Sequence, residues 1–551
     1  MRKFSWRDGA WRSCWRRSAL VAPVLLSLVA CLACVFAQQD RGTSQTQVRP
    51  RRVASAPGGN TTTIRAGGNL QQAIDRAQPG DTLLLEAGAS FTGTYTLPAK
   101  PVGNASGANW ITIRTSAPDS ALPPAGTRIT PAHAHLLPKL LSPGKNAPAL
   151  QTAAGAHHYR LVGLEIAPAS ASAEITNLVT LGDGSEAQNR IETVPHHLVI
   201  ERCYIHAYPE QALRRGIALN SASTDILDSH LSDFKATVDA QAIWGWNGPG
   251  PFRIINNYLS ASGEVAGFGG TEPAIAGLVP SDIEFRRNYC TRNLAWRGRW
   301  LVKNVFELKN GQRVHVEGNV MEHNWADGQV GYAIVLTPGN GTGTPSAVVQ
   351  DITIVNNIIR HTGAGVNILD YGWVVGNTRA SRQTNRIVIR NNLFQDVNAN
   401  VWGGEGALVK LTGTPQVTFD HNTVLQSGNI TTAYGNASEG FVFTNNIVNH
   451  NLYGLMGAGQ GGGNPTIAVF FPNSVIRRNV FIGGEAERYP VDNFFTPSLE
   501  GVKFADRARG DFRLAATSAY RGRATDGRDV GCDITALNAA LAVTDRLPLA
   551  P

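Results

Sequence analysis

Two short apolar segments each carry a pair of side chains suited to chemistry. Glu307 and Lys309 lie two residues apart in one segment, and Trp244 and Trp246 lie two residues apart in an earlier one. Residues two apart in an extended strand project from the same face, so each pair would share a surface. A carboxylate beside an amine can move protons, and indole rings offer flat apolar faces for stacking. The sequence therefore predicts a site that combines proton transfer with aromatic stacking.

Seven segments share one register that would bring these residues into a single stripe. Their second and fourth residues are mostly apolar and should point inward, while the third and fifth should face solvent. The segments are Gly216–Asn220, Ala242–Trp246, Val265–Gly269, Val305–Lys309, Ala333–Thr337, Val366–Asp370 and Leu408–Thr412. The stripe would include Trp244, Trp246, Gly267, Gly269, Glu307, Lys309, Asp370 and Lys410, with Asn310 and Tyr371 beside it as further contacts. Its glycines would leave room for a bound chain.

An internal repeat identifies the architecture that carries these strands. Alternating apolar residues are followed by Asn and then by two apolar positions, at separations of 24 to 38 residues. Asn tolerates sharp bends, and coils stacked about 4.8 Å apart would let the amides form a ladder. Cys203 and Ser229 occupy the equivalent position in earlier coils. The predicted ladder residues are Asn257, Asn288, Asn319, Asn357, Asn392, Asn422, Asn446 and Asn479. We interpret them as structural.

Several segments resemble the pectate-lyase-like superfamily. Leu70–Gly88 is similar to its opening helix and first strand, and Trp110–Thr115 to an early coil. Asp511–Leu514, followed by Thr525–Gly531, resembles the closing segment of many secreted bacterial members. The resemblance implies an all-β fold, a right-handed parallel β-helix over residues 59–515 with a short N-terminal capping helix, and a closing segment over 516–551. It also implies that substrates lie along the sheet that comes before the Asn-ending strands in each coil.

The N-terminal segment has the composition of an export signal. A basic stretch precedes an apolar run that ends at Ala37, which predicts a signal peptide over residues 1–37 and a disordered linker over 38–58. An alternative is a lipoprotein box that would leave Cys31 lipidated. We expect a secreted, periplasmic or surface-exposed bacterial protein, monomeric and with no membrane span in its mature form.

The location of the charged residues and the spacing of the cysteines argue against nucleic acid and zinc as ligands of the folded part. The first 56 residues carry ten basic and two acidic side chains, which accounts for the whole formal net charge of +8. The rest of the chain is formally neutral, so its basicity is no argument for nucleic acid. The body holds no C-x-x-C zinc site, and we interpret the pairs His157-His158 and His196-His197 as ordinary turn residues rather than metal ligands.

Three functions remain open for the stripe. In a polysaccharide lyase, Lys309 would be the base, Lys410 would neutralise a uronate carboxylate, and Glu307 or Glu264 could hold Ca²⁺. In a hydrolase, Glu307 and Asp370 would lie about 10 Å apart, nearer the spacing of an inverting pair. A non-catalytic glycan-binding or adhesion protein could use the same surface. We expect β-elimination on an acidic polysaccharide, although the polygalacturonase motifs are absent and no family's catalytic signature matches residue by residue.

Overall fold

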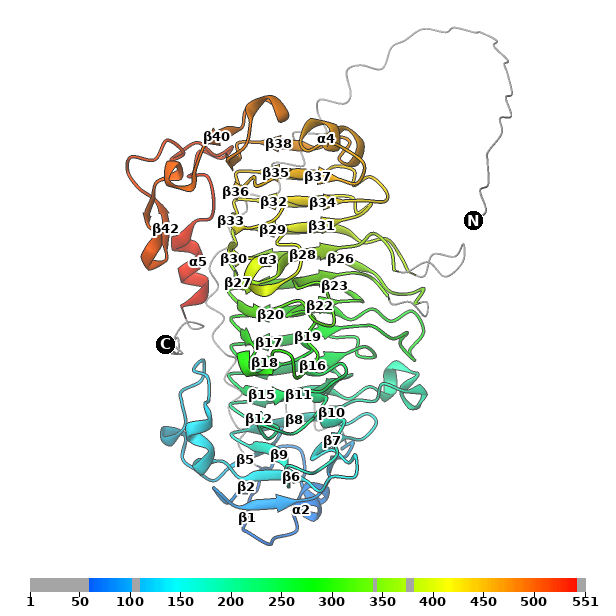
Figure 1. Ribbon diagram of the computed structural model, residues 1–551. Helices are drawn as coiled ribbons and strands as arrows, with labels where there is room; N and C mark the ends of the chain where they lie inside the picture. The colour runs from blue at the N-terminus through cyan, green and yellow to red at the C-terminus, as the bar shows by residue number, and fades with distance from the viewer. Residues whose placement is uncertain (1–58, 102–109, 340–343, 373–380, 543–551) are drawn as a thin grey trace, which may run out of the picture. The chain divides into compact units, whose positions relative to one another are not determined.

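The computed structural model describes residues 59–101, 110–339, 344–372 and 381–542. The predicted signal peptide and linker lie outside these residues. Within the described body, the chain passes through three sheets of parallel strands in turn, one strand of each per coil (Figure 1). Parallel connections of this kind are right-handed in nearly all proteins. The predicted fold, a right-handed parallel β-helix, is confirmed.

The three sheets are named here in the order in which each coil crosses them. Sheet A holds β1 (Thr61–Ile64), β2 (Thr82–Leu85), β5 (Ile111–Thr115), β8 (His157–Val162), β11 (His196–Glu201), β14 (Ala222–Leu227), β17 (Phe252–Ile255), β20 (Ser281–Arg286), β23 (Gly311–Glu317), β26 (Val349–Val355), β29 (Asn385–Arg390), β32 (Val417–Asp420), β35 (Val442–Thr444) and β38 (Val475–Arg477). Sheet B holds β3 (Ser90–Thr92), β6 (Lys139–Ser142), β9 (Glu165–Pro168), β12 (Tyr204–His206), β15 (His230–Phe234), β18 (Tyr258–Ala261), β21 (Tyr289–Thr291), β24 (Val320–Asn324), β27 (Ile358–Thr362), β30 (Leu393–Val397), β33 (Thr423–Gln426), β36 (Ile447–Asn449), β39 (Val480–Ile482) and β40 (Phe494–Thr496). Sheet C holds β4 (Tyr95–Leu97), β7 (Leu150–Thr152), β10 (Asn177–Leu181), β13 (Arg215–Leu219), β16 (Gln241–Gly245), β19 (Glu264–Phe268), β22 (Phe306–Leu308), β25 (Tyr332–Leu336), β28 (Ala364–Ile368), β31 (Val409–Leu411), β34 (Thr431–Ala433) and β37 (Leu455–Gly457).

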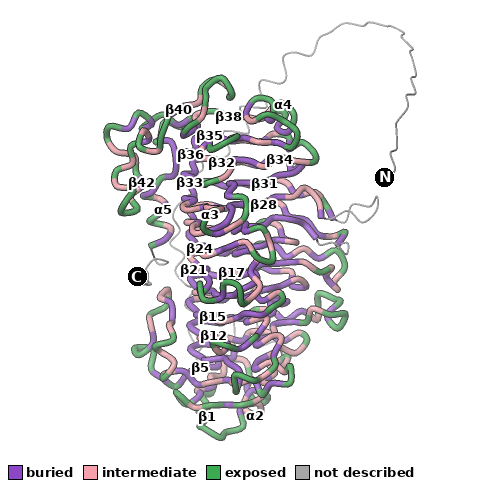
Figure 2. Tube along the Cα trace, viewed as in Figure 1, coloured by how far each residue is buried: buried purple, intermediate pink, exposed green. Residues whose placement is uncertain are grey.

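Inward-facing side chains of the three sheets stack into one continuous core. Buried residues recur along the whole length of the solenoid (Figure 2). In sheet A, Ile254 pairs with Phe285 and Phe285 with Val316, and all three are fully buried. Burying an aliphatic or aromatic side chain contributes about 1.5–3 kcal/mol, so each coil is stabilised mainly by its neighbours.

The predicted asparagine ladder runs along the bend between sheets A and B. Asn257 Nδ2 donates to Asn288 Oδ1 at 3.1 Å, and Asn288 Nδ2 donates to Asn319 Oδ1 at 3.1 Å. The same contact continues from coil to coil as far as Asn479, and one step further than predicted, to Asn493. The left-handed backbone of the bend belongs to the preceding residue, for example Asn256 at φ 57°. The ladder residues satisfy backbone groups inside the bend, which confirms their structural role.

Short helices and a returning segment complete the described body. Helix α2 (Leu70–Arg76) buries Leu70 and Ile74 at the N-terminal end of the solenoid, and the Asn69 side chain caps it by accepting from Gln72 N. The helices α3 (Ala399–Trp402) and α4 (Asn464–Phe470) lie in loops between coils. Near the C-terminus, β41 (Phe504–Asp506) and β42 (Asp511–Leu514) pair antiparallel. Helix α5 (Ile534–Leu541) then packs beside Val320 and Leu393 of sheet B, so this segment returns along the solenoid.

The predicted register of the sheet C strands holds with one exception. Val366 pairs with Ile334 and Asn367 with Val335, one residue earlier than expected from the segment Val366–Asp370. Val366 and Ile368 are fully buried because they, and not their neighbours, continue the inward apolar column. Asn367 therefore takes the outward position in this coil, and Asp370 lies beyond the end of β28.

Candidate functional site: a basic cleft on sheet C

A cleft of about 490 Å³ opens over the middle of sheet C. It lies over β13, β16 and β19 and the turns that flank β22. Four basic and two acidic side chains line it, together with two tryptophans. The lining residues are Arg214, Arg215, Asp239, Gln241, Trp244, Trp246, Glu264, Gly269, Gly270, Thr271, Lys303 and Lys309.

The two tryptophans form the apolar part of the cleft, as predicted from their register. Trp244 is 6% exposed, and its Nε1 donates to the Gly269 carbonyl at 3.0 Å. Trp246 is half-buried and donates to the Gly184 carbonyl at 2.9 Å. A Cβ on Gly267 would lie 2.5 Å from the Trp244 ring, so that glycine makes room for the indole. The expectation that Gly267 makes room for a bound chain is therefore wrong.

An acidic side chain sits in the wall of the cleft between a lysine and a glutamine. Glu264 is 2% exposed, accepts from Gln241 Nε2 at 2.9 Å, and has an oxygen 3.3 Å from Lys303 Nζ. Burial, reinforced by the nearby Glu307 carboxylate, raises the pKa of Glu264 to about 7. Burial opposes the charged form of Lys303, but Glu264 and Asp239 raise its pKa to about 12. Lys303 therefore keeps its proton, while Glu264 can exchange one near neutral pH.

Glu307 and Lys309 form an ion pair at the edge of the cleft. Lys309 Nζ lies 3.2 Å from Glu307 Oε1, and the two side chains are 25% and 0% exposed. Among the described residues, neither oxygen of Glu307 has a hydrogen-bond partner of good geometry. The predicted pair thus exists, but only Lys309 reaches the cleft. Glu307 lies underneath it.

Two arginines give the opposite wall its charge. The guanidinium of Arg215 lies over the Trp246 ring at 5.3 Å, and burial lowers its pKa to about 10. Arg214 donates to the Asp239 carbonyl at 3.1 Å. Planar guanidinium groups bind carboxylates with two parallel hydrogen bonds, so this wall is suited to an acidic ligand.

The acidic residues of the cleft do not fit the predicted calcium site. Glu264 is already engaged by Lys303 and Gln241, and Glu307 by Lys309. Calcium takes six to eight oxygen ligands. Within the described ranges, no carboxylates in this cleft bring three ligand atoms within 4.8 Å of one another. We therefore assign no step to calcium.

Four other predicted site residues lie away from the cleft lining: Lys410 and Asp370, described here, and Asn310 and Tyr371, which belong to turns. Lys410 shares the outward row of Glu307 but is three strands away, about 14 Å at 4.8 Å per strand, and pairs with Glu405 at 3.0 Å. Asp370 accepts from Thr412 Oγ1 at 2.8 Å and from Asn436 Nδ2 at 3.1 Å.

The remaining two predicted contacts belong to turns. Asn310 is 1% exposed and uses its amide on the backbone of Leu278 and Val348. Tyr371 follows Asp370 beyond the end of β28, and its backbone N donates to the Asp370 carboxylate. Because Glu307 is fully buried and Asp370 is held by Thr412 and Asn436, the structure does not assemble the predicted hydrolase pair.

The cleft also contains residues that the strand register could not identify. Arg214 and Asp239 precede the strands β13 and β16, while Lys303 lies in a long loop before β22. In the sequence, Lys303 stands only in a basic stretch. The one sequence feature that Arg214, Asp239 and Lys303 share is that each lies shortly before a sheet C strand.

Comparisons with known proteins concern the fold. No protein-family model matches the sequence, and a search of curated proteins finds no relative. Among solved structures, the PL6 family alginate lyase AlyGC is 12% identical, with a TM-score of 0.49 over 89% of this chain and 59% of that one. The Dettilon tailspike protein is 13% identical, with a TM-score of 0.40 over 79% and 68%. The catalytic unit of a GH87 α-1,3-glucanase from Streptomyces thermodiastaticus is 12% identical, with a TM-score of 0.40 over 80% and 71%. The chain thus spans less than two thirds of the alginate lyase.

Proposed function

We propose that this protein is a secreted enzyme that cleaves an acidic polysaccharide by β-elimination in the sheet C cleft. The observation that supports the proposal is the combination of two tryptophans, an arginine pair and Lys309 around one space of about 490 Å³. Indole faces stack on sugar rings, and guanidinium groups pair with uronate carboxylates. The same combination would serve a neutral polysaccharide poorly, because the guanidinium groups would face a substrate that carries no carboxylate.

The chemistry assigned to the cleft follows from its charges. Lys309 takes the proton next to the uronate carboxyl group, the electron pair forms a carbon–carbon double bond, and the bond to the leaving sugar oxygen breaks. Lys309 must first lose its own proton, and the Glu307 carboxylate 3.2 Å away can accept it. The arginines stabilise the negative charge that develops on the carboxyl group. The leaving oxygen takes its proton from solvent.

A substrate panel tests this proposal against its alternatives. The full chain is incubated with alginate, pectate and glycosaminoglycans, and with a neutral glucan as the control. Elimination predicts products with an ultraviolet-absorbing unsaturated end from at least one acidic polymer. New reducing ends without that absorbance would indicate a hydrolase. Retention on an acidic polymer without any product would indicate a binding or adhesion protein.

A further inference from the structure

A cluster of imidazole rings lies on the outer face of sheet A, outside the proposed cleft. His157 and His158 begin β8, and His196 and His197 begin β11. The two strands are neighbours, and His157 pairs with His196 in the register. Residues that are far apart in the sequence therefore stand side by side, which overturns the interpretation of the two pairs as separate turn residues.

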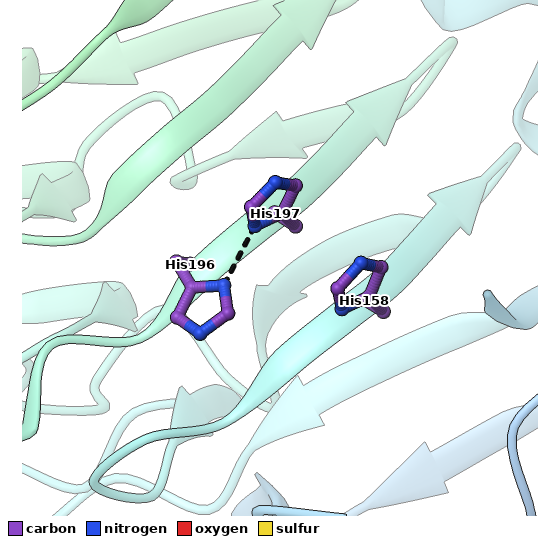
Figure 3. A group of neighbouring side chains, drawn as sticks. All are labelled: His158, His196 and His197. Carbon is purple, nitrogen blue, oxygen red and sulfur yellow. Dashed lines mark hydrogen bonds between the residues drawn. The ribbon is translucent and has the colours of Figure 1, made fainter. Parts of the chain in front are cut away.

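The geometry of the cluster brings ring nitrogens together. His158 stacks on His197 with ring centroids 4.6 Å apart and an interplanar angle of 4°. The Nδ1 atoms of His196 and His197 are 2.6 Å apart (Figure 3). One ligand atom from each of His158, His196 and His197 lies within 4.8 Å of the other two. A tetrahedral zinc site needs ligand nitrogens about 3.4 Å apart, given Zn–N bonds of about 2.1 Å. The side chains would need to move by only about an ångström.

The left-handed backbone at His158 and His197 is part of the fold, but residues of other types occupy the same position in other coils. His158 and His197 have left-handed backbone, at φ 59° and 54°. The same position in later coils is also left-handed, and there it carries ion-paired residues such as Asp282 and Arg313, with Nε 2.7 Å from the carboxylate. The left-handed position thus recurs along sheet A, and in several later coils it holds ion-paired residues. Among the residues that the structure describes, this position gathers imidazoles in these two coils alone, and the group contains no carboxylate.

All ligand atoms of the cluster are imidazole nitrogens, and this determines the class of cation that it suits. A neutral imidazole offers one unprotonated ring nitrogen as a metal ligand. An all-imidazole set suits Zn²⁺, Cu²⁺ and Ni²⁺, whereas Ca²⁺ and Mg²⁺ require oxygen ligands. His197 is exposed and the other two are half-buried, so an ion can enter from solvent.

We propose that His158, His196 and His197 form a binding site for a late first-row divalent cation, with one coordination position left for water. The proposal does not depend on the function of the sheet C cleft. Titration calorimetry with Zn²⁺ on the full chain, prepared without a histidine tag, should show one saturable equivalent. Electron paramagnetic resonance of the Cu²⁺ form should show coupling to imidazole nitrogen.

Matched variants make the test decisive. His158→Asn and His197→Asn keep a residue type that tolerates left-handed backbone, so the bend should survive. Each should weaken Zn²⁺ binding by more than about tenfold, since even outer-shell partners are worth that much. His315→Gln, a half-buried histidine in β23 on the same sheet, is the control and should bind as the unmodified chain does. Equal Zn²⁺ affinity in folded His197→Asn and in the unmodified chain would overturn the proposal, as would no binding at all.

Discussion

Glu307 is a buried carboxylate next to the cleft, and an ion pair compensates its charge. It is fully buried, and Lys309 is the ion-pair partner 3.2 Å from its carboxylate. Removing one partner of a buried pair leaves an uncompensated charge, which costs far more than the pair itself contributes. The pair thus couples the stability of the fold to the reactivity of the cleft.

This coupling predicts the behaviour of single and double substitutions. Lys309→Met should lower the free energy of unfolding by about 3 kcal/mol, because Glu307 is left buried and unpaired. Adding Glu307→Gln removes the charge and should restore most of that loss. Urea unfolding of the two variants and the unmodified chain measures the effect. If the double variant were less stable than Lys309→Met alone, the two side chains would not be coupled as described.

The raised pKa of Glu264 predicts a pH dependence of stability. Its pKa of about 7 in the folded state lies above the ordinary value near 4.5, so the folded state favours the protonated form. The resulting stabilisation is present below about pH 4.5 and is lost as the pH rises to about 7. Glu264→Gln should therefore gain stability relative to the unmodified chain, by an amount on the order of 3 kcal/mol, between these pH values. Denaturation midpoints from pH 4.5 to 8 would show this, and parallel curves for both proteins would contradict it.

At the scale of the element, the asparagine ladder should be the most sensitive part of the coil. Asn357 is fully buried, and its Oδ1 accepts from both the backbone N and the Nδ2 of Asn319. Asn357→Ala would leave those donors without a partner, at about 1–3 kcal/mol for each group. Asn400→Ala, at an exposed position of α3, is the control and should change stability by less than about 0.5 kcal/mol. Equal losses from the two substitutions in urea unfolding would contradict the role of the ladder.

The elements also show what the sequence could and could not predict. The ladder and most strand registers follow from local patterns, because period-2 alternation and Asn bends repeat in successive coils from Asn257 onward. The register of β28 was misplaced by one residue, since Val366 resembles the first residue of the other segments although it occupies the second position. The arginine pair and the histidine cluster depend on which turns the coils bring together. Variable loop lengths hide that proximity from the sequence.

At the scale of the whole molecule, the location of charge decides where an acidic polymer would bind under the proposed function. The formal net charge of +8 belongs to the first 56 residues, and the remaining residues are formally neutral. In the described residues, no helix is long and apolar enough to cross a membrane. Attraction to an acidic chain must then come from a local surface such as the cleft, with four basic and two acidic lining residues.

The charge distribution predicts how truncation and point substitution compare. A chain that begins at residue 57 should bind acidic oligosaccharides as tightly as the full chain does. Arg214→Ala should weaken binding by about tenfold or more, since a hydrogen bond to a charged group is worth about 1.5–3 kcal/mol. Arg513→Ala, an arginine outside the cleft, is the control. Fluorescence titrations at matched salt measure these affinities. A large loss on truncation, with none in Arg214→Ala, would place the binding surface elsewhere.

One comparison tests the central claim most directly: the steady-state rate of unsaturated-end formation in Lys309→Met and in Lys410→Met. Lys410 lies in β31 of sheet C and Lys309 directly after β22, and both pair with a glutamate, but of the two only Lys309 lines the cleft. If Lys309 is the general base, Lys309→Met should lower kcat/KM by about 10²–10⁴-fold, while Lys410→Met should stay within about threefold of the unmodified chain. Unchanged kcat/KM in folded Lys309→Met, or an equal loss in Lys410→Met, would contradict the assignment of the cleft.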